Sequence, residues 1–277
     1  MPFQLITPRH QEMIQGLVDR IPDSTLSVIA ETLAVLIDQI KNDIPQKRRA
    51  SIGRYSIVKA LGAEIYPLLE EAGIRVLKFA EDIFLNPEHD PFVRSIAIQI
   101  FSLYSIKTGD LGSVLPYFEK AAADQDWIAR ECASGLVRKL TRAFPGQIRS
   151  WYLELVKSDD PNQRRFVSES LRPVVENRWF HKDPEYALGI ISHLFKEAEP
   201  YPRTSVGNNL SDWMRVNEGL AWPIVQELAQ NGDQNSYWIA TRACRNIVKK
   251  EPVKVMRLLD IEEYKYKNRR YKLTDYQ

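Results

Sequence analysis

The sequence contains few cysteines and few glycines. Its two cysteines, Cys132 and Cys244, lie far apart among 277 residues and show neither CxxC nor Cys/His spacing. This arrangement gives no sign of a disulfide framework or a zinc site, so we expect a reducing, cytoplasmic location. Only 12 glycines are present. Their scarcity argues against a fold built mainly of β-strands.

Signals for export, membrane insertion and cofactor binding are also missing. The N-terminal segment MPFQLITPRH lacks a basic and then apolar pattern, and no run of 18 apolar residues occurs. We therefore expect a protein that is neither exported nor bound to a membrane. The four histidines form no HExxH or other ligand-spaced group, and the glycine patterns of nucleotide-binding loops are absent. Neither a metal nor a cofactor is expected.

Positive charge is concentrated near one end of the chain. Hydrophobic residues make up 44% and charged residues 27% of the sequence, as in ordinary globular proteins, and the net charge is only +2. Residues 238–277 contain 11 Lys and Arg against 5 Asp and Glu, an excess of +6, which leaves −4 for residues 1–237. The distribution of charge is therefore more informative than the net value.

Apolar residues recur at helical spacing in most of the longer segments, as in residues 24–40 and 184–198. No comparable stretch alternates strictly between apolar and polar residues, so no strands are expected. Short polar joints separate the helical segments. Five of these joints are NPEHDP (86–91), ADQD (123–126), SDDPN (158–162), EPYP (199–202) and NGDQN (231–235).

The helical segments repeat at a regular spacing. Aligned on their last apolar residue, five of them end on Ile100, Leu136, Leu171, Leu210 and Ile247, which are 36, 35, 39 and 37 residues apart. Such a period with two helices per unit predicts an all-α superhelix, a solenoid of HEAT-like repeats. We expect one domain over residues 1–277, with an N-terminal helical cap (1–85), phased repeats (86–260) and a basic C-terminal tail (261–277).

Three carboxylates of successive repeats share one direction on the predicted helices. Because an α-helix turns about 100° per residue, Glu131, Glu169 and Asp212 point roughly 220°, 160° and 200° away from their anchors. They are therefore expected to face away from the core on one side. Trp127 and Trp238 project to roughly 180° by the same rule.

The same positions in the outer repeats carry other residue types. In the last repeat they are basic, namely Arg242, Arg245 and Lys249. In the first repeat they are Ser95, Ile98 and Ser102, and the apolar Ile98 suggests that this part of the face is covered. One stripe thus runs from uncharged through acidic to basic.

A purely structural interpretation of this stripe stays open. Polar residues opposite an apolar anchor are typical of any amphipathic surface helix, and tryptophans near helix starts usually pack against neighbours. Arginines that recur near helix starts fit ion pairs that join one repeat to the next. These arginines are Arg94, Arg130, Arg165 and Arg203.

Three motifs lie between Trp127 and Glu251. The pattern RRxxSE followed by RP is formed by Arg164, Arg165, Ser168, Glu169, Arg172 and Pro173, SVGNNLSD spans residues 205–212, and a basic close spans residues 245–250. On these motifs the stretch from Trp127 to Glu251 resembles the AlkC-type alkylpurine DNA glycosylases, in which the second motif reads SVANNLND, and more distantly the AlkD type. The N-terminal half resembles the family only in being helical.

The resemblance implies a DNA-repair site. It makes Asp212 the leading catalytic carboxylate, with Glu169 and Glu131 beside it. Trp179 would correspond to a substrate-binding tryptophan, although VVEN and Arg178 lengthen the link before it. Trp127 and Trp238 are the other substrate-binding candidates. We expect no counterpart of the immunoglobulin-like domain that follows the repeats in many AlkC-type proteins, because a basic, tyrosine-rich segment follows the repeats here.

The function implied is excision of cationic N3- or N7-alkylated purines from duplex DNA by a monomer. Arg242, Arg245, Lys249 and Lys250 are expected to bind the DNA backbone, because carboxylates near phosphates need flanking cations. Two alternatives stay open: a non-catalytic protein that recognises DNA structure, and a HEAT-repeat scaffold for other proteins. Further DNA contacts are conceivable from the tail, through Lys265, Lys267, Arg269, Arg270, Lys272 and the rings of Tyr264, Tyr266 and Tyr271.

Overall fold

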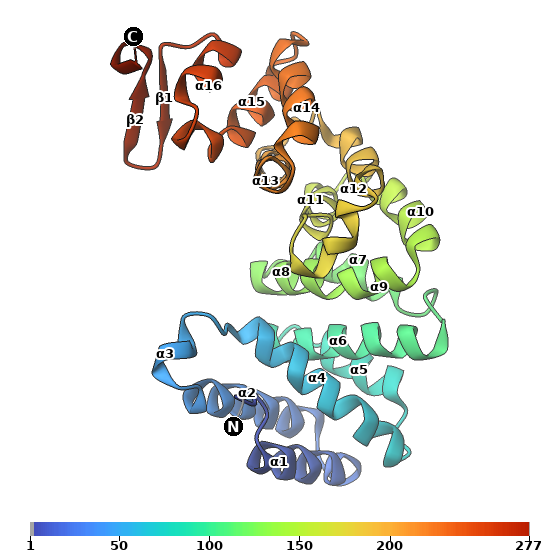
Figure 1. The fold of residues 1–277 in the computed structure, drawn as a ribbon. Coiled ribbons are helices and arrows are strands. Elements are labelled where there is room, and N and C mark those ends of the chain that lie inside the picture. Colours follow the sequence, from blue (N-terminus) through green and yellow to red (C-terminus); the bar gives the residue numbers. More distant parts are fainter. Residues whose placement is uncertain (1–2, 277) are drawn as a thin grey trace. The chain divides into compact units, whose positions relative to one another are not determined.

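The computed structural model describes residues 3–276, which form sixteen α-helices and one two-stranded antiparallel sheet (Figure 1). Within this range no helix combines the length and the apolarity needed to cross a membrane. The predicted all-α fold of helical repeats is confirmed. Internal contacts divide the chain into two compact units, unit 1 ending at Ala143 and unit 2 beginning at Phe144. The prediction of one domain stays a prediction.

Unit 1 is helical throughout its described part. Helices α4 and α8 both pack on α6, and α5 and α7 pack on α6 and α8 respectively. The N-terminal segment 1–85 therefore joins the repeats through α4 and α5. The elements are α1 (Pro8–Asp19), η1 (Ile21–Asp23), α2 (Leu26–Asp43), α3 (Gln46–Arg49), α4 (Arg54–Glu71), α5 (Val76–Leu85), α6 (Pro91–Thr108), α7 (Leu115–Ala122), α8 (Trp127–Leu136) and α9 (Arg138–Ala143).

Unit 2 continues the same kind of stacking. Helix α13 packs on α11, one repeat before it, and on α15, one repeat after it, and α14 packs on α13 and α15. The elements are α10 (Pro145–Leu155), α11 (Pro161–Ser170), η2 (Val175–His181), α12 (Pro184–Ile191), η3 (Ser192–Leu194), α13 (Pro200–Val216), α14 (Glu218–Gln230), α15 (Gln234–Ala243), η4 (Ile247–Lys249), α16 (Pro252–Leu259), β1 (Glu263–Tyr266), β2 (Arg269–Lys272) and η5 (Leu273–Tyr276).

Four of the five polar joints provide helix N-caps. Side-chain oxygens of Asp90, Asp126, Asp160 and Asp233 accept backbone N–H groups in the first turns of α6, α8, α11 and α15. Each such cap is worth about 1 kcal/mol, because it satisfies a donor that the helix leaves free. Proline follows two of these caps at the first helical position, where its missing N–H costs nothing.

The anchors of the sequence repeat form the core. All five, Ile100, Leu136, Leu171, Leu210 and Ile247, are buried. Ile98 is buried as well, as its apolar character suggested. Ser95 and Ser102 are also buried, although their positions predicted an outward direction. Helices pack on both flanks of α6, so little of its surface is left open.

The C-terminal segment, which was expected to be a basic tail, contains a β-hairpin. Strands β1 and β2 pair antiparallel, with Tyr264 opposite Tyr271, and both rings are buried. The expectation that no strands form was wrong here. Each strand has only four residues, too few for alternation to stand out in the sequence. The buried rings of Tyr264 and Tyr271 do not offer a stacking surface for bases.

Candidate functional site

Two predicted carboxylates of unit 2 converge on a single arginine. Glu169 lies in the last turn of α11, Asp212 lies in α13, and Arg172 follows α11 directly. The Arg172 guanidinium donates to Asp212 Oδ2 through Nε at 2.7 Å and Nη2 at 2.5 Å, and to Glu169 Oε2 through Nη1 at 3.0 Å. We call these three residues the carboxylate–arginine cluster.

Further polar groups surround the cluster. Ser205 Oγ donates to Glu169 Oε1 at 2.7 Å. Arg165 Nη2 lies 3.9 Å from the same oxygen, and Arg215 Nη2 lies 3.7 Å from Asp212 Oδ1. Three guanidinium groups therefore face two carboxylates, and the local charge is positive.

Burial and neighbouring charges have opposite effects on the pKa of Arg172. Burial by itself would lower the pKa of Arg172, but the neighbouring Glu169 and Asp212 favour the charged form, and the pKa is raised overall. Glu169 and Asp212 are each only 5% exposed. The two acids thus lie beneath Arg172, whereas the helical projection expected them on an open face.

Local hydrogen bonds fix the turn that carries Arg172. Asn177 Nδ2 donates to the carbonyl oxygens of Ser170 and Arg172, both at 2.8 Å. Asn209 Nδ2 donates to the carbonyl oxygen of Ser168 at 2.7 Å and so ties α13 to α11. Arg172 was assigned no role from the sequence, although it belongs to the RP part of the AlkC-like motif.

A group of basic residues adjoins the carboxylate–arginine cluster in the next repeat. We call residues 242–250, with Arg242, Arg245, Lys249 and Lys250, the basic segment. The side-chain oxygen of Asn208 accepts from Arg242 Nε at 3.0 Å and from Arg245 Nη1. Burial, and next the charge of Arg242, lower the pKa of Arg245. Asn246 Nδ2 donates to Ser211 Oγ at 3.0 Å. Asn208 therefore joins successive repeats, because it links α13 to Arg242 in α15 and to Arg245 just after that helix.

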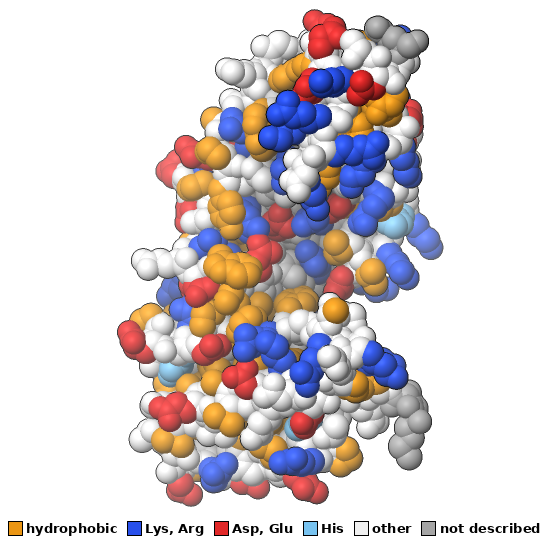
Figure 2. Space-filling model, turned by 90° about the vertical axis from the view of Figure 1, so that its left-hand side faces the viewer, with side chains coloured by type: hydrophobic (Ala, Val, Ile, Leu, Met, Phe, Trp, Pro, Cys, Tyr) orange, Lys and Arg blue, Asp and Glu red, His pale blue; other side chains and the backbone are white. Residues whose placement is uncertain are grey.

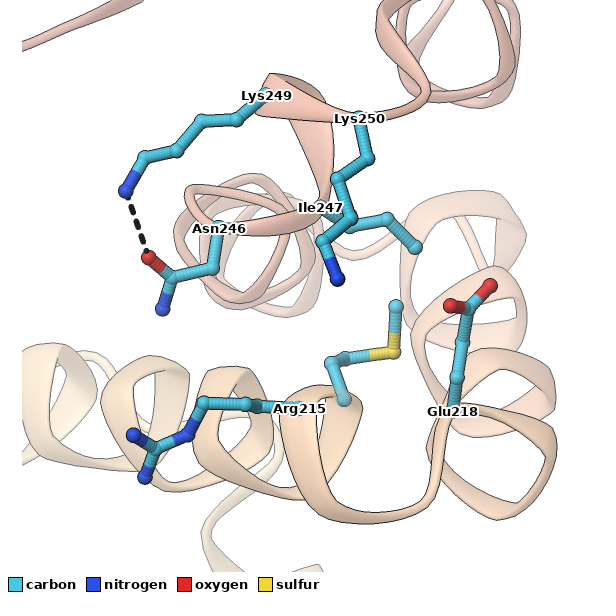
Figure 3. Close-up of a pocket in the computed structure, with 7 residues that line it drawn as sticks. Arg215, Glu218, Asn246, Ile247, Lys249 and Lys250 are labelled. Carbon is cyan, nitrogen blue, oxygen red and sulfur yellow. Dashed lines mark hydrogen bonds between the residues drawn. The ribbon is translucent and has the colours of Figure 1, made fainter.

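Lys249 and Lys250, the other predicted backbone-binding residues, border a small pocket of about 250 Å³ (Figure 3). Figure 3 shows Lys250 directed into this pocket, with Arg215 and Glu218 across from it. Lys249 Nζ donates to Asn246 Oδ1 at 3.2 Å. Because Arg215 also approaches Asp212, the cationic pocket and the carboxylate–arginine cluster are continuous within unit 2.

Unit 1 contains a separate pocket of about 520 Å³ with aromatic walls. It brings together Trp127 and Glu131, which both lie on α8, with Tyr55 and Phe92. The Trp127 side chain is 62% exposed, so its ring is open to a ligand. Tyr55 and Phe92 carried no motif, and Gly135 made room for Tyr55, because a Cβ at that position would collide with the tyrosine ring. We call this the unit 1 pocket.

The other two predicted tryptophans lie in different surroundings. Trp179 is part of η2 and packs against Phe180 and Tyr186, with ring centroids 4.4 and 4.8 Å away. Trp238 lies under the Arg203 guanidinium, 4.7 Å from its ring centroid. Trp179 thus belongs to an aromatic packing cluster, while Trp238 borders the basic segment. The substrate-binding roles of Trp127, Trp179 and Trp238 stay predictions.

Two of the four arginines near helix starts, Arg94 and Arg203, join successive repeats, and Arg130 donates to carbonyl oxygens of the joint before its own helix. Arg94 pairs with Asp124, and Arg203 Nη1 donates to Asn235 Oδ1 at 2.6 Å. In the third repeat the ion pair comes from Arg164, whose Nε donates to Glu197 Oε2 at 2.7 Å. Arg165 instead lies 4.4 Å above the Tyr201 ring, near Glu169. The neighbouring residues Arg164 and Arg165 of α11 therefore have different partners, because they point in different directions from the helix.

The predicted set of three carboxylates spans the two units. Glu131 belongs to unit 1, and Glu169 and Asp212 belong to unit 2. A single site formed by all three therefore stays a prediction. Among residues 3–276 no group of three or more His, Cys, Asp or Glu side chains is placed to hold a metal ion.

Two solved structures are similar in fold. AlkD2 from Streptococcus mutans aligns with a TM-score of 0.58 at 19% identity, over 75% of this chain and 95% of that one. The alkylpurine DNA glycosylase AlkC of Pseudomonas fluorescens, bound to DNA containing an abasic site analog, aligns with a TM-score of 0.56 at 15% identity, over 94% of this chain and 68% of that one. No family model and no curated protein matches the sequence. The chain therefore has the helical-repeat fold of the AlkC- and AlkD-like alkylpurine DNA glycosylases.

Proposed function

We propose that this protein is a DNA-repair enzyme, an N-glycosylase that releases cationic N3- or N7-alkylated purines from duplex DNA. The observation that carries the proposal is the convergence of Glu169 and Asp212, from successive repeats, on one guanidinium. Both acids stand at positions where the sequence resembles AlkC-type proteins, and the fold is similar to an AlkC structure with DNA bound.

The chemistry requires little from the enzyme. An alkylated purine already carries positive charge, so it departs without a general acid. What remains is an oxocarbenium-like sugar, which carboxylates stabilise, as in glycoside hydrolysis. We assign Asp212 to this stabilisation and to positioning of water, with Glu169 and Glu131 in support.

Arg172 would act as an exchangeable counter-ion. In the DNA-free protein it neutralises Glu169 and Asp212, and its side chain is 27% exposed. Phosphates are strong bidentate partners for a guanidinium. If Arg172 turns to a phosphate when DNA binds, the two carboxylates lose their counter-ion and become available to the sugar cation.

The unit 1 pocket offers a surface that suits a cationic base. The face of an electron-rich ring attracts a cation, and tryptophan, the residue type at position 127, does so most strongly. A volume of about 520 Å³ lies within the usual range of small-ligand pockets. Glu131 adds a carboxylate to this aromatic set. These properties support a role of the pocket in binding the alkylated base.

One observation favours a second candidate, a non-catalytic protein that binds DNA structures. Arg165, Arg172 and Arg215 all approach the two buried acids of unit 2. If Arg172 stays in place on DNA, Glu169 and Asp212 contribute only to stability. The basic segment would then bind DNA without base release.

The test is base release from methylated duplex DNA. Wild-type protein is expected to release 3-methyladenine or 7-methylguanine, and Asp212→Asn is expected to slow release at least about 100-fold, as loss of one charge-stabilising group does. Glu227→Gln, which removes one carboxylate from an exposed position on α14, is the matched control and should behave as wild type.

The outcomes separate the candidates. No release by the wild type together with salt-sensitive DNA binding supports the non-catalytic candidate. Full release by Asp212→Asn contradicts the assignment of Asp212. Absence of DNA affinity at low salt removes both candidates and leaves the protein scaffold.

A further inference from the structure

The C-terminal hairpin is anchored to the repeats by one of its faces. Tyr264 and Tyr271 are directly opposite each other and are buried. Tyr264 Oη donates to the carbonyl oxygen of Thr241 in α15 at 2.6 Å, and β1 also packs on α16. The hairpin therefore has a fixed position on α15 and α16.

The outward face of the hairpin is cationic and contains an unfavourable pair. Residues that alternate along a strand share a face, so Glu263, Lys265, Arg270 and Lys272 point away from the tyrosines. Lys265 lies directly opposite Arg270 in the strand register. Like charges in this arrangement destabilise a sheet. Glu263 offsets part of the repulsion, with its Oε1 3.3 Å from Arg270 Nη1.

The turn carries a second unfavourable feature. Lys267 adopts φ 54°, in the left-handed region that favours glycine or asparagine. The Lys267 side chain is exposed, and its Nζ lies 5.8 Å from the centroid of the neighbouring Tyr266 ring. Both unfavourable features thus involve cationic side chains.

The hairpin is continuous with the basic segment of the repeats. Lys249 Nζ lies 5.0 Å from the centroid of the Tyr266 ring. Arg242 and Arg245 of the α15 region line a cleft of about 250 Å³ together with Lys265 and Trp238. Figure 2 shows many Lys and Arg side chains on the upper part of the face it presents, where Figure 1 places α15, α16 and the hairpin.

We propose that the hairpin is a phosphate-binding arm that binds the backbone of duplex DNA beside the basic segment of the repeats. Lys265 and Arg270 are its principal contacts, and Lys267 and Lys272 extend it. A phosphate between Lys265 and Arg270 would turn their repulsion into attraction. The proposal shares with the proposed function only the partner, DNA, and needs no base release.

Charge and composition favour DNA over a membrane surface. Binding of a peripheral element to a membrane depends on apolar side chains that insert below the headgroups. The outward face of the hairpin carries three cations, one carboxylate and no apolar residue. A two-stranded ribbon is also narrow enough to follow a DNA groove.

The test is the salt dependence of binding to unmodified duplex DNA. The double variant Lys265→Gln/Arg270→Gln should bind roughly tenfold more weakly at moderate salt, and the slope of log K against log salt should fall by about 0.9 for each lost phosphate contact. Its melting temperature should stay unchanged or rise, because the like-charge pair is removed. A purely structural role predicts the opposite.

The control removes two exposed cations elsewhere in unit 2, as Lys157→Gln/Lys196→Gln. This variant should keep wild-type affinity and slope. Equal affinity and slope for the hairpin variant and wild type would overturn the proposal, as would a complete lack of DNA binding by wild type. If wild-type protein binds DNA but releases no base, the proposed function is contradicted and the hairpin proposal stands.

Discussion

The unit 1 pocket and the carboxylate–arginine cluster of unit 2 treat their carboxylates differently. Glu131 borders an open pocket with aromatic walls and is only partly covered. Glu169 and Asp212 are buried beneath Arg172, which donates to both of them. All three acids were predicted to point in one direction in successive repeats, yet Arg172 is the counter-ion of Glu169 and Asp212 alone among them.

This difference shows how the surroundings assign a role to a repeated residue type. An acid beside an exposed tryptophan in an open pocket is suited to bind a cationic ligand. A buried acid that is held by arginine first has to lose that partner. The free energy needed to separate Arg172 from Glu169 and Asp212 therefore decides whether the carboxylate–arginine cluster is catalytic or purely structural.

The largest effect is expected from Arg172→Ala. Without the guanidinium, two buried carboxylates lose their main counter-ion, and the free energy of unfolding should fall by about 3 kcal/mol. Urea denaturation of unit 2, followed through its tryptophans, measures this change. The triple variant Arg172→Met/Glu169→Gln/Asp212→Asn should recover most of the loss, since no uncompensated charge remains. A wild-type midpoint for Arg172→Ala would mean that the cluster adds nothing to stability.

A smaller contrast is expected between Glu169→Gln and Glu131→Gln. Glu169 accepts from Ser205 and Arg172 in a buried place, so its neutralisation should lower the free energy of unfolding by about 1 to 3 kcal/mol. Glu131→Gln, at a partly exposed position, should change it by less than about 1 kcal/mol. Both values come from the same denaturation experiment. Equal losses would remove the distinction between the two regions.

Trp127→Ala tests the unit 1 pocket more directly. Because the side chain is 62% exposed, its removal should leave the melting temperature nearly unchanged. Loss of one stacking ring should weaken binding of DNA that carries an alkylated purine by roughly tenfold, while binding of unmodified duplex stays the same. Fluorescence anisotropy with the two duplexes gives both affinities. An equal change for both duplexes would contradict a base-specific role.

The smallest effect concerns the thiols of the two units. Burial raises the pKa of Cys132 from 9.0 to about 11 and that of Cys244 to about 12. The folded state therefore keeps protons that the unfolded state releases above pH 9, and this contribution to stability is lost as the pH rises through 11. Unfolding midpoints between pH 8 and 11 should fall, and both thiols should react with a thiol reagent only after unfolding. Fast reaction of Cys132 in the folded protein would show that the unit 1 pocket opens further.

Much of the fold was predictable from the sequence. The spacing of Ile100, Leu136 and Leu210 follows from the need of each helix pair to bury one apolar stripe against its neighbours. The joints were predictable because Asp126 and Asp160 cap helices through short-range contacts. The hairpin was missed, since its strands are short and its stability comes from the burial of Tyr264 and Tyr271 on distant helices.

The candidate site was predictable in residue type but not in environment. The helical projection and the family resemblance both selected Glu169 and Asp212. Neither the projection nor the resemblance gave Arg172 a role, because its contact with Asp212 joins residues forty positions apart in the sequence. Tyr55, on the wall of the unit 1 pocket, lay outside every motif for the same reason.

By itself, then, the sequence determined a helical-repeat chain with acids and a basic end at defined positions, because helix periodicity and capping are local properties. Only the tertiary structure decided which acids are buried beneath Arg172, which tryptophan is open and which face of the hairpin is cationic. These properties depend on burial and on charges brought together from separate repeats, and the strength of both is set by distance in space.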